Sequence, residues 1–234
     1  MRVGGTTTTQ HIMRGQILKG NYVVVGLTNE NVWKEALRCI RRNGEYITDP
    51  QNLEKTQEVL NLITSILKPS NTLPRAFSRD TKINDHPHLL EGLVRPIPGF
   101  SPGTHLWEWA LPRGRLNQIE DNVTKVLRNN LLSRRAVALT FHPGMDSEHI
   151  LNPRYSFPAI QIVDFKYREG SLHLTAYLRS CDIYSWWPIN VVQAYRLLKK
   201  VGEKLDLSIG TLTLMISSAH VKARNLKRIE TILV

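Results

Sequence analysis

The stretch RSCDIYSWWPIN, residues 179–190, decides how the rest of the chain is interpreted. It places an arginine, a serine and an aspartate within four positions, and Asn190 follows eleven residues after Arg179. A guanidinium beside a hydroxyl suits a phosphate, because the arginine can bind two oxygens in a fork and the serine can donate to a third. Asn190 precedes a helical pattern, so two interpretations stay open. It is either a helix N-cap or an amide that pairs with N3–H and O4 of a uracil ring.

The charge balance also indicates an anionic ligand. The 234 residues include 31 basic and 20 acidic side chains, which gives a net charge of +11. Such an excess is typical of proteins that bind nucleic acid, a membrane surface or phosphorylated small molecules. The basic residues are dispersed in doublets, which argues against a polybasic tail. A nucleic-acid partner would rest on charge alone, without a recognisable reading element, and is therefore not expected.

Membrane, secretory and metal-binding classes are disfavoured. No run of 18 apolar residues occurs, and the first sixteen residues lack the apolar centre of a signal peptide. Cys39 and Cys181 are too few for a disulfide framework or a metal cluster. We expect a cytoplasmic, reduced protein without a metal or a membrane partner.

The N-terminal part predicts strands and then helices. Asn29 or Asn31 can cap the first helix, Gly44 stops it, and Pro69 ends the second. The predicted elements are strands over 16–20 and 21–27 and helices over 32–44 and 53–67.

A long connector follows, over residues 69–104, and it contains six prolines. Its pattern predicts one short helix near 88–94. A connector of this length is either a binding loop or lid or a meandering surface loop, and the sequence leaves both open.

The C-terminal part mixes helices with antiparallel strands, without strict alternation of the two. The predicted elements are a helix over 117–130, a strand over 134–143, a hairpin over 159–180 with its turn at 168–171, a helix over 190–205, a strand over 210–221 and a helix over 223–233. This order predicts the α+β class, with a mixed or antiparallel sheet in a single domain over residues 1–234.

Six ordered anchor points within residues 117–225 resemble the thymidylate synthase family. They are the Gln-Ile pair of the 117–130 helix, the Ser-Arg-Arg turn at 133–135, Pro158 before a strand, Arg-Ser-Cys-Asp at 179–182, Pro-Ile-Asn at 188–190 and Ala-His at 219–220. The compact length and the segment DFKYREGSLHLTAYLRSCDI look most like the short archaeal-type branch. The first 100 residues match only in outline.

The resemblance implies a nucleotide monophosphate as ligand and a homodimer as the assembly. Arg179 and Ser180 fall where the family grips the phosphate. Arg134 and Arg135 fall where arginines of one subunit reach into the phosphate site of the other. Two phosphate-binding pairs from two chains would also explain part of the positive charge.

The remaining anchors imply how the base, the sugar and the second substrate are held. Asn190 falls where the family recognises the uracil edge, and Asp182 falls at a position associated with the folate and the closed site. His220 falls where a His, with a Tyr two residues on, holds the ribose 3′-hydroxyl. The resemblance thus implies dUMP as substrate, one-carbon transfer to C5, and methylene-tetrahydrofolate or a related pterin as donor.

Three features depart from the family pattern. Ala159 stands where the family has its nucleophilic Cys, whose thiolate attacks C6 of the uracil. Cys181 is on the next strand, where alternation should point it away from the site. Lys222 replaces the ribose Tyr, and it can bind a hydroxyl, a phosphate or a carboxylate. The chain also ends fourteen residues after His220, which leaves folate binding open.

These departures leave three hypotheses. The protein is an enzyme of this family whose Cys was changed by engineering, or a natural enzyme that runs altered chemistry in the same pocket. The alternative is a non-catalytic nucleotide-binding protein that serves as a sensor or scaffold. The change at Lys222 favours a natural origin, because a simple active-site variant would not also lose the ribose Tyr.

Overall fold

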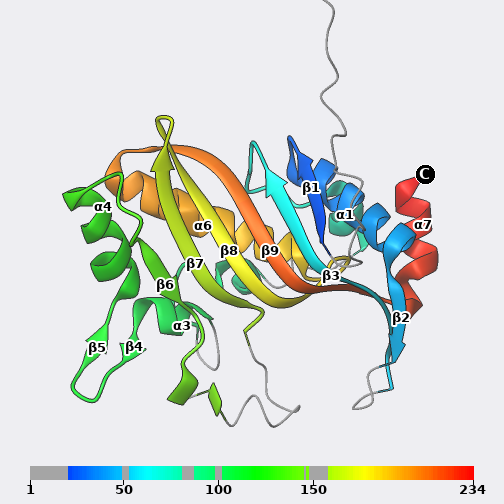
Figure 1. Cartoon of the computed structure of the whole chain (residues 1–234), viewed down its shortest axis with the longest axis horizontal. Coiled ribbons are helices and arrows are strands. Elements are labelled where there is room, and N and C mark those ends of the chain that lie inside the picture. The colour runs from blue at the N-terminus through cyan, green and yellow to red at the C-terminus, as the bar shows by residue number, and fades with distance from the viewer. Residues whose placement is uncertain (1–20, 49–52, 81–86, 98–101, 145, 148–157) are drawn as a thin grey trace, which may run out of the picture.

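The centre of the fold is a seven-stranded mixed sheet (Figure 1). The computed structural model describes residues 21–48, 53–80, 87–97, 102–144, 146–147 and 158–234. The strand order is β1-β3-β9-β8-β7-β6, with β2 paired to β3. The strands are β1 (Tyr22–Gly26), β2 (Glu45–Thr48), β3 (Lys55–Ile66), β6 (Val137–Leu139), β7 (Ile160–Arg168), β8 (Ser171–Asp182) and β9 (Ser208–Lys222).

The sheet combines both kinds of pairing. β1 and β3 are parallel, as are β8 and β9, whereas the other neighbours in the sheet are antiparallel. The predicted α+β class with a mixed sheet is therefore confirmed.

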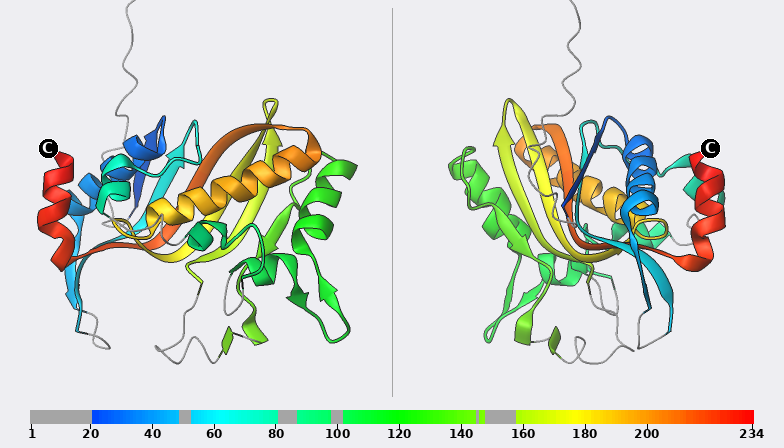
Figure 2. Two further views of the ribbon diagram at one scale, coloured as in Figure 1. Left: turned by 180° about the vertical axis from the view of Figure 1, so that it is seen from behind. Right: turned by 45° about the vertical axis from the view of Figure 1, so that its right-hand side comes forward.

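Two long helices cover one face of the sheet, as the view from behind shows (Figure 2). They are α1 (Asn29–Asn43) and α6 (Trp187–Leu205). Their apolar sides bury large residues such as Trp33 and Trp187 against the sheet, which forms the core. The smaller elements are α2 (Arg75–Asp80), η2 (Pro87–Glu91), α3 (Pro102–Trp107), β4 (Trp109–Ala110), β5 (Arg115–Leu116), η3 (Ile119–Thr124), α4 (Lys125–Asn129), η4 (Ala223–Asn225) and α7 (Leu226–Leu233).

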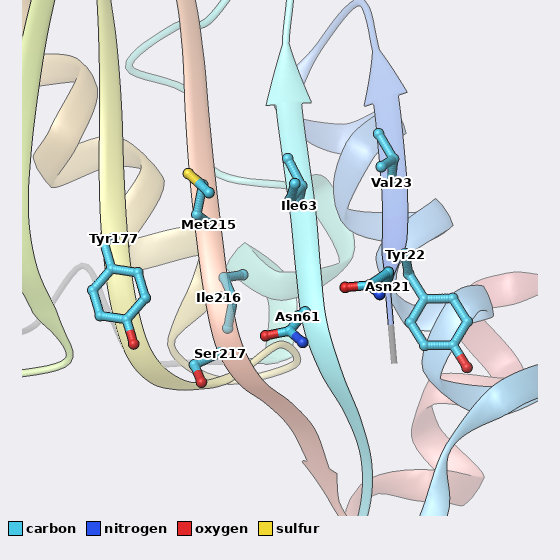
Figure 3. Close-up of a pocket in the computed structure, with 9 residues that line it drawn as sticks. All are labelled: Asn21, Tyr22, Val23, Asn61, Ile63, Tyr177, Met215, Ile216 and Ser217. Atoms are coloured by element: carbon cyan, nitrogen blue, oxygen red, sulfur yellow. The ribbon is translucent and has the colours of Figure 1, made fainter. Parts of the chain in front are cut away.

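The other face of the sheet exposes apolar side chains. Val23 of β1 is 67% exposed, Met215 of β9 is 42% exposed and Tyr177 of β8 is 40% exposed. Together with Ile63 of β3 they line a shallow depression of about 240 Å³ across four adjacent strands (Figure 3). We call this surface the open face. It also includes the exposed side chains of Leu139 and Ile162.

Most of the predicted elements are present. The hairpin of β7 and β8 turns at Glu169 and Gly170, both with positive φ, which is the conformation of a two-residue type I′ turn. The first helix ends at Gly44 as predicted, but its N-cap is Thr28, whose Oγ1 accepts from the Asn31 backbone N–H. The predicted strand over 16–20 lies outside the described residues.

The prediction of a helix over 53–67 is wrong, because this segment forms β3. Its buried residues alternate on either side of an irregularity at Asn61, which has a φ of +53°. The step from Val59 to Leu62 is therefore three residues instead of two. That single step gives the segment helical spacing, while pairing with β9 and β1 on both sides fixes it as a strand.

In the part of the chain that the structure describes, no helix is long and apolar enough to cross a bilayer.

The short helix predicted near 88–94 is present as η2.

Candidate nucleotide site

The candidate site lies where the alternation of buried and exposed side chains shifts by one residue on three neighbouring strands. The shift falls at paired positions of the three strands. On β3, β9 and β8 the buried positions alternate up to Leu62, Ile216 and Leu178, and they resume out of phase at Val59, Ala219 and Cys181. Each strand thus carries one extra residue at this level, as in a stack of β-bulges. Bulges re-aim side chains, and the predicted site residues of β8 and β9 follow this stack directly.

The register brings the predicted residues of the two strands together. Ser180 lies beside Ser218, and Asp182 lies beside His220. The Ser180 Oγ is 3.5 Å from His220 Nδ1. The next strand continues the row, because Glu58 of β3 lies beside His220 on its other side. Three strands, β3, β8 and β9, therefore contribute to one polar cluster at this end of the sheet.

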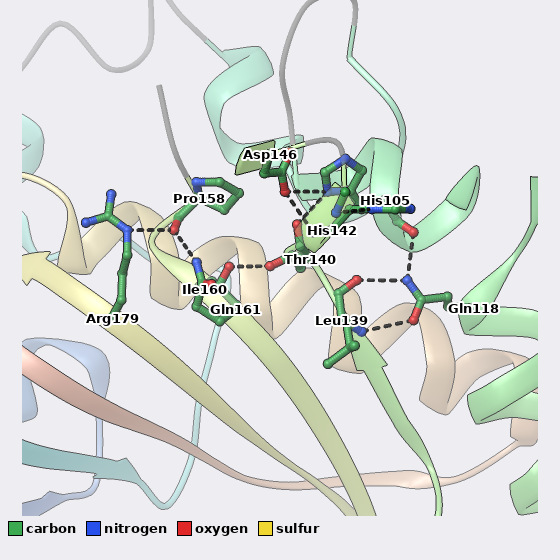
Figure 4. Close-up of polar contacts among 11 residues, drawn as sticks. His105, Gln118, Leu139, Thr140, His142, Asp146, Pro158, Ile160, Gln161 and Arg179 are labelled. Carbon is green, nitrogen blue, oxygen red and sulfur yellow. Dashed lines mark hydrogen bonds and ion pairs between the residues drawn. The ribbon is translucent and has the colours of Figure 1, made fainter. Parts of the chain in front are cut away.

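Arg179 is hydrogen-bonded to the chain segment that precedes β7 (Figure 4). Its Nε donates to the Pro158 carbonyl at 3.1 Å, and its backbone N–H donates to the Ala159 carbonyl at 3.0 Å. Partial desolvation lowers the pKa of the Arg179 guanidinium from its usual value. The structure therefore brings together Arg179 and Ala159, which the resemblance places in one site.

The Pro158 carbonyl is itself fixed by a hydrogen-bonded chain that sequence reasoning missed. Gln161 Nε2 donates to it at 2.6 Å. Thr140 anchors the same segment, because its backbone N–H donates to the Gln161 carbonyl at 2.9 Å and its hydroxyl donates to the Ile160 carbonyl. Single polar residues in short strands carry no distinctive sequence signal, so this brace was not predictable.

A buried cluster supports the end of β6. His105 Nδ1 lies 2.6 Å from the Thr140 carbonyl and 3.7 Å from Asp146 Oδ2. Gln118 Nε2 donates to the carbonyls of His105 and Leu139 at 2.8 Å each. Gln118 belongs to the Gln-Ile anchor, so that anchor has a structural role at β6.

Cys181 lies on the helix side of the sheet, as the alternation argument predicted. It is 3% exposed, and Asn190 Nδ2 is 3.5 Å from its Sγ. Burial strongly raises the pKa of the Cys181 thiol. A buried thiol with a raised pKa is a poor nucleophile, so the environment of Cys181 argues against a role as a replacement nucleophile.

Asn190 lies within α6, so the interpretation as a helix N-cap is wrong. The N-cap is Trp186, and the Asn190 backbone N–H donates to the Trp186 carbonyl at 2.9 Å. The helix begins before Asn190, at Trp187, because Pro188 is tolerated in the first turn. The Asn190 side chain is 6% exposed and lies close to Cys181.

Asp182 is 4% exposed and only half satisfied. Its Oδ1 accepts from the backbone N–H groups of Tyr184 and Ser185 at 3.0 and 3.2 Å. Its Oδ2 is buried and, within the described residues, accepts no hydrogen bond. An unsatisfied buried carboxylate oxygen costs stability, so this atom is a candidate acceptor for a ligand N–H or O–H.

Lys222 is engaged by a carboxylate. Its Nζ is 2.8 Å from Glu54 Oε2, and Arg224 Nη1 is 2.9 Å from Glu54 Oε1. The hydrogen bond from Lys222 is the main reason that the pKa of Glu54 lies below its usual value. Of the three partners left open for Lys222, the structure places it against a carboxylate.

Arg134 and Arg135 do not join the other site residues within one chain. Both are exposed in the segment before β6, next to the pairing of Ala136 with Phe165. Along β7, Phe165 is six residues from Ala159, or roughly 20 Å at the rise of a β-strand. An arginine side chain cannot span that distance.

Within the described residues, no group of three or more His, Cys, Asp or Glu side chains is arranged to hold a metal ion.

Comparison with known proteins identifies the family. The sequence pattern of the family described as "Thymidylate synthase" matches residues 86–234. A protein of Methanococcoides burtonii named "Putative thymidylate synthase" is 33% identical over 214 residues, which cover 88% of this chain and 92% of that protein. Proteins of the same name from Methanosarcina barkeri and Methanocaldococcus jannaschii are 30% and 28% identical, and cover 90% and 82% of this chain and 94% and 86% of their own lengths. The chain therefore belongs to the thymidylate synthase family, and its relatives include proteins of methanogenic archaea.

Proposed function

We propose that the chain binds a pyrimidine nucleoside 5′-monophosphate of the dUMP type and serves one-carbon transfer to C5 of its base. Two observations support this most directly: Arg179 is hydrogen-bonded to Pro158 and Ala159, and the Ser180 hydroxyl that follows it lies 3.5 Å from His220 Nδ1. The guanidinium and hydroxyl would bind the phosphate, and the imidazole would bind the sugar. For Asn190 to recognise the uracil edge, its side chain, which lies against Cys181, would have to turn toward the base.

The partner subunit would complete the phosphate site. Arg134 and Arg135 are exposed and about 20 Å along the sheet from Ala159, so only a second chain could bring such a pair to Arg179. The exposed apolar side chains of the open face are the natural surface for a homodimer, because contiguous apolar patches on proteins often mark interfaces.

A folate or related pterin fits one feature of the site. The buried Asp182 Oδ2 has no donor within the described residues and would be satisfied by a ring N–H group of a pterin. When bound, such a group supplies the one-carbon unit. Asp182 would hold it near the base, since Asp182 lies beside His220 in the register.

A second candidate function is a non-catalytic nucleotide-binding protein, a sensor or scaffold. The observation that favours it is the absence of a usable thiol. Ala159 has only a methyl group, and the Cys181 thiol is buried with a raised pKa.

Titration calorimetry with dUMP tests the nucleotide site shared by both candidates. Arg179→Ala should weaken binding roughly ten- to a hundredfold, because it removes a charge-assisted hydrogen bond to the phosphate. Arg42→Ala is the matched control, since Arg42 is exposed on α1 on the opposite side of the sheet. Equal affinity of the Arg179→Ala variant and the unaltered protein would refute the assignment.

A further inference from the structure

Gln161 shares a hydrogen-bond acceptor with the candidate phosphate ligand Arg179. Arg179 Nε donates to the Pro158 carbonyl at 3.1 Å, and Gln161 Nε2 donates to the same oxygen at 2.6 Å (Figure 4). A backbone carbonyl oxygen has two lone pairs and can accept both bonds. The side chains of Gln161 and Arg179 are therefore coupled through one atom of the chain.

The Pro158 carbonyl depends on Gln161 for its position. A proline has no backbone N–H, so the carbonyl is the one backbone polar group through which a hydrogen bond can hold the residue. Pro158 precedes β7, whereas Gln161 belongs to that strand, and its own carbonyl accepts from the Thr140 backbone N–H at 2.9 Å. The Gln161 amide thus reaches back three residues and ties Pro158 to the sheet.

The carbonyl in turn orients the Arg179 side chain. The Arg179 backbone N–H donates to the Ala159 carbonyl at 3.0 Å, so both ends of this residue are bonded to the same short segment. A guanidinium is planar and rigid, and a bond at Nε therefore sets the direction in which both Nη groups point. Arg179 is exposed, and an exposed arginine without such a bond samples many rotamers.

We propose that Gln161 is a positioning residue for the phosphate of the ligand: it holds the Pro158 carbonyl, which aims the Arg179 guanidinium before the nucleotide arrives. This rests on the proposed function, because it requires a phosphate at Arg179. Gln161 acts through Arg179 and does not itself touch the ligand. Ordering one long side chain in advance favours binding by roughly two- to tenfold.

A double-mutant cycle tests the coupling by titration calorimetry with dUMP. Gln161→Met keeps the length of the side chain but has no N–H donor, so it should weaken binding roughly two- to tenfold. In the Arg179→Ala background the same change should have no effect, because the residue that Gln161 positions is then absent. An equal loss in both backgrounds, or no loss in either, would overturn the proposal.

A matched control separates positioning from a general loss of stability. Gln193 of α6 makes the same kind of bond, because its Nε2 donates to the Leu89 carbonyl. Gln193→Met should lower the urea-unfolding midpoint about as much as Gln161→Met but leave dUMP affinity unchanged. Should Gln161→Met fail to fold, Gln161→Thr is the replacement, because threonine suits a strand and is too short to reach the Pro158 carbonyl.

The two levels of proposal fail differently. If the unaltered protein does not bind dUMP, or if Arg179→Ala binds it equally well, the proposed function itself fails. If binding depends on Arg179 but loses nothing in Gln161→Met, or loses the same in both backgrounds, only the positioning role of Gln161 fails.

Discussion

Ala159 and Cys181 divide between them the two properties that a nucleophilic cysteine needs. The resemblance to the family assigns the position of the nucleophile to Ala159, whose carbonyl accepts from the Arg179 backbone N–H, but Ala159 has no thiol. Cys181 has the thiol, but it is 3% exposed on the helix side and its pKa is raised by burial. Neither residue alone can form an adduct at C6 of a bound uracil.

Ala159→Cys should therefore place a thiol where the family pattern has one. The Arg179 guanidinium next to it should lower the thiol pKa and favour the thiolate. We expect a covalent adduct with 5-fluoro-dUMP and a folate donor, seen by mass spectrometry, and tritium release from C5-labelled dUMP. Ala159→Ser, of similar size, is the control and should give neither.

The alternatives give different results in the same assay. Little restoration despite normal dUMP binding would favour a pocket that has drifted, at Lys222 and elsewhere, toward other chemistry or toward binding alone. One-carbon transfer by the unaltered protein would contradict the interpretation of Ala159 as disabling, because catalysis would then proceed without a cysteine adduct.

At the scale of elements, regular periodicity separates the strands and helices that the sequence predicted from the strand β3 that it did not. The hairpin of β7 and β8 and the helix α6 were predictable because their periodicities are regular and a Glu-Gly turn separates the strands. β3 was not, because its extra residue at Asn61 imitates helical spacing.

Because β3 was predicted as a helix, the acidic residues on its side of the polar cluster were not predicted. Glu54 and Glu58 meet Lys222 and His220 only because β3 pairs with β9. Such pairing over more than 150 residues of chain is set by the tertiary fold. Local spacing carries no signal for it, whereas the candidate site residues of β8 could be proposed from the sequence because they are contiguous.

The ion pair between Glu54 and Lys222 should give the junction of β3 and β9 a pH-dependent stability. The pKa of Glu54 is lowered in the folded state, so its contribution is present above the unfolded pKa of about 4.3 and is lost as the pH falls through the folded value. Lys222→Met should cost about 1 kcal/mol at pH 7 and less at pH 3, measured by urea unfolding.

Lys199→Met provides the comparison, because Lys199 pairs with Glu203 at a more exposed position of α6 and should change stability little at either pH. A loss in Lys222→Met that is as large at pH 3 as at pH 7 would show that the lysine stabilises the junction through packing of its stem and not through its charge.

At the scale of the whole molecule, the open face and the separation of Arg134 and Arg135 from Arg179 both bear on the proposed homodimer. Tyr177, Met215 and Val23 expose apolar surface across adjacent strands (Figure 3). Arg134 and Arg135 are exposed before β6, far from Arg179 of the same chain. A dimer through the open face would cover the apolar surface and could bring each arginine pair to the partner's Arg179.

A complementation experiment tests this arrangement in full. Arg179→Ala and the double variant Arg134→Ala/Arg135→Ala should each bind dUMP weakly as homodimers. After the two are mixed and allowed to exchange subunits, each mixed dimer has one site with both defects and one site with all three arginines. Up to a quarter of all sites should then regain tight binding in calorimetry, because half of the dimers are mixed at random exchange.

Light scattering should give a dimer mass. Met215→Glu, which puts a charge into the proposed interface, should give a monomer and abolish the regain of tight binding. A monomeric unaltered protein that binds dUMP tightly would leave Arg134 and Arg135 without this role, as would mixing that recovers no tight site despite proven exchange.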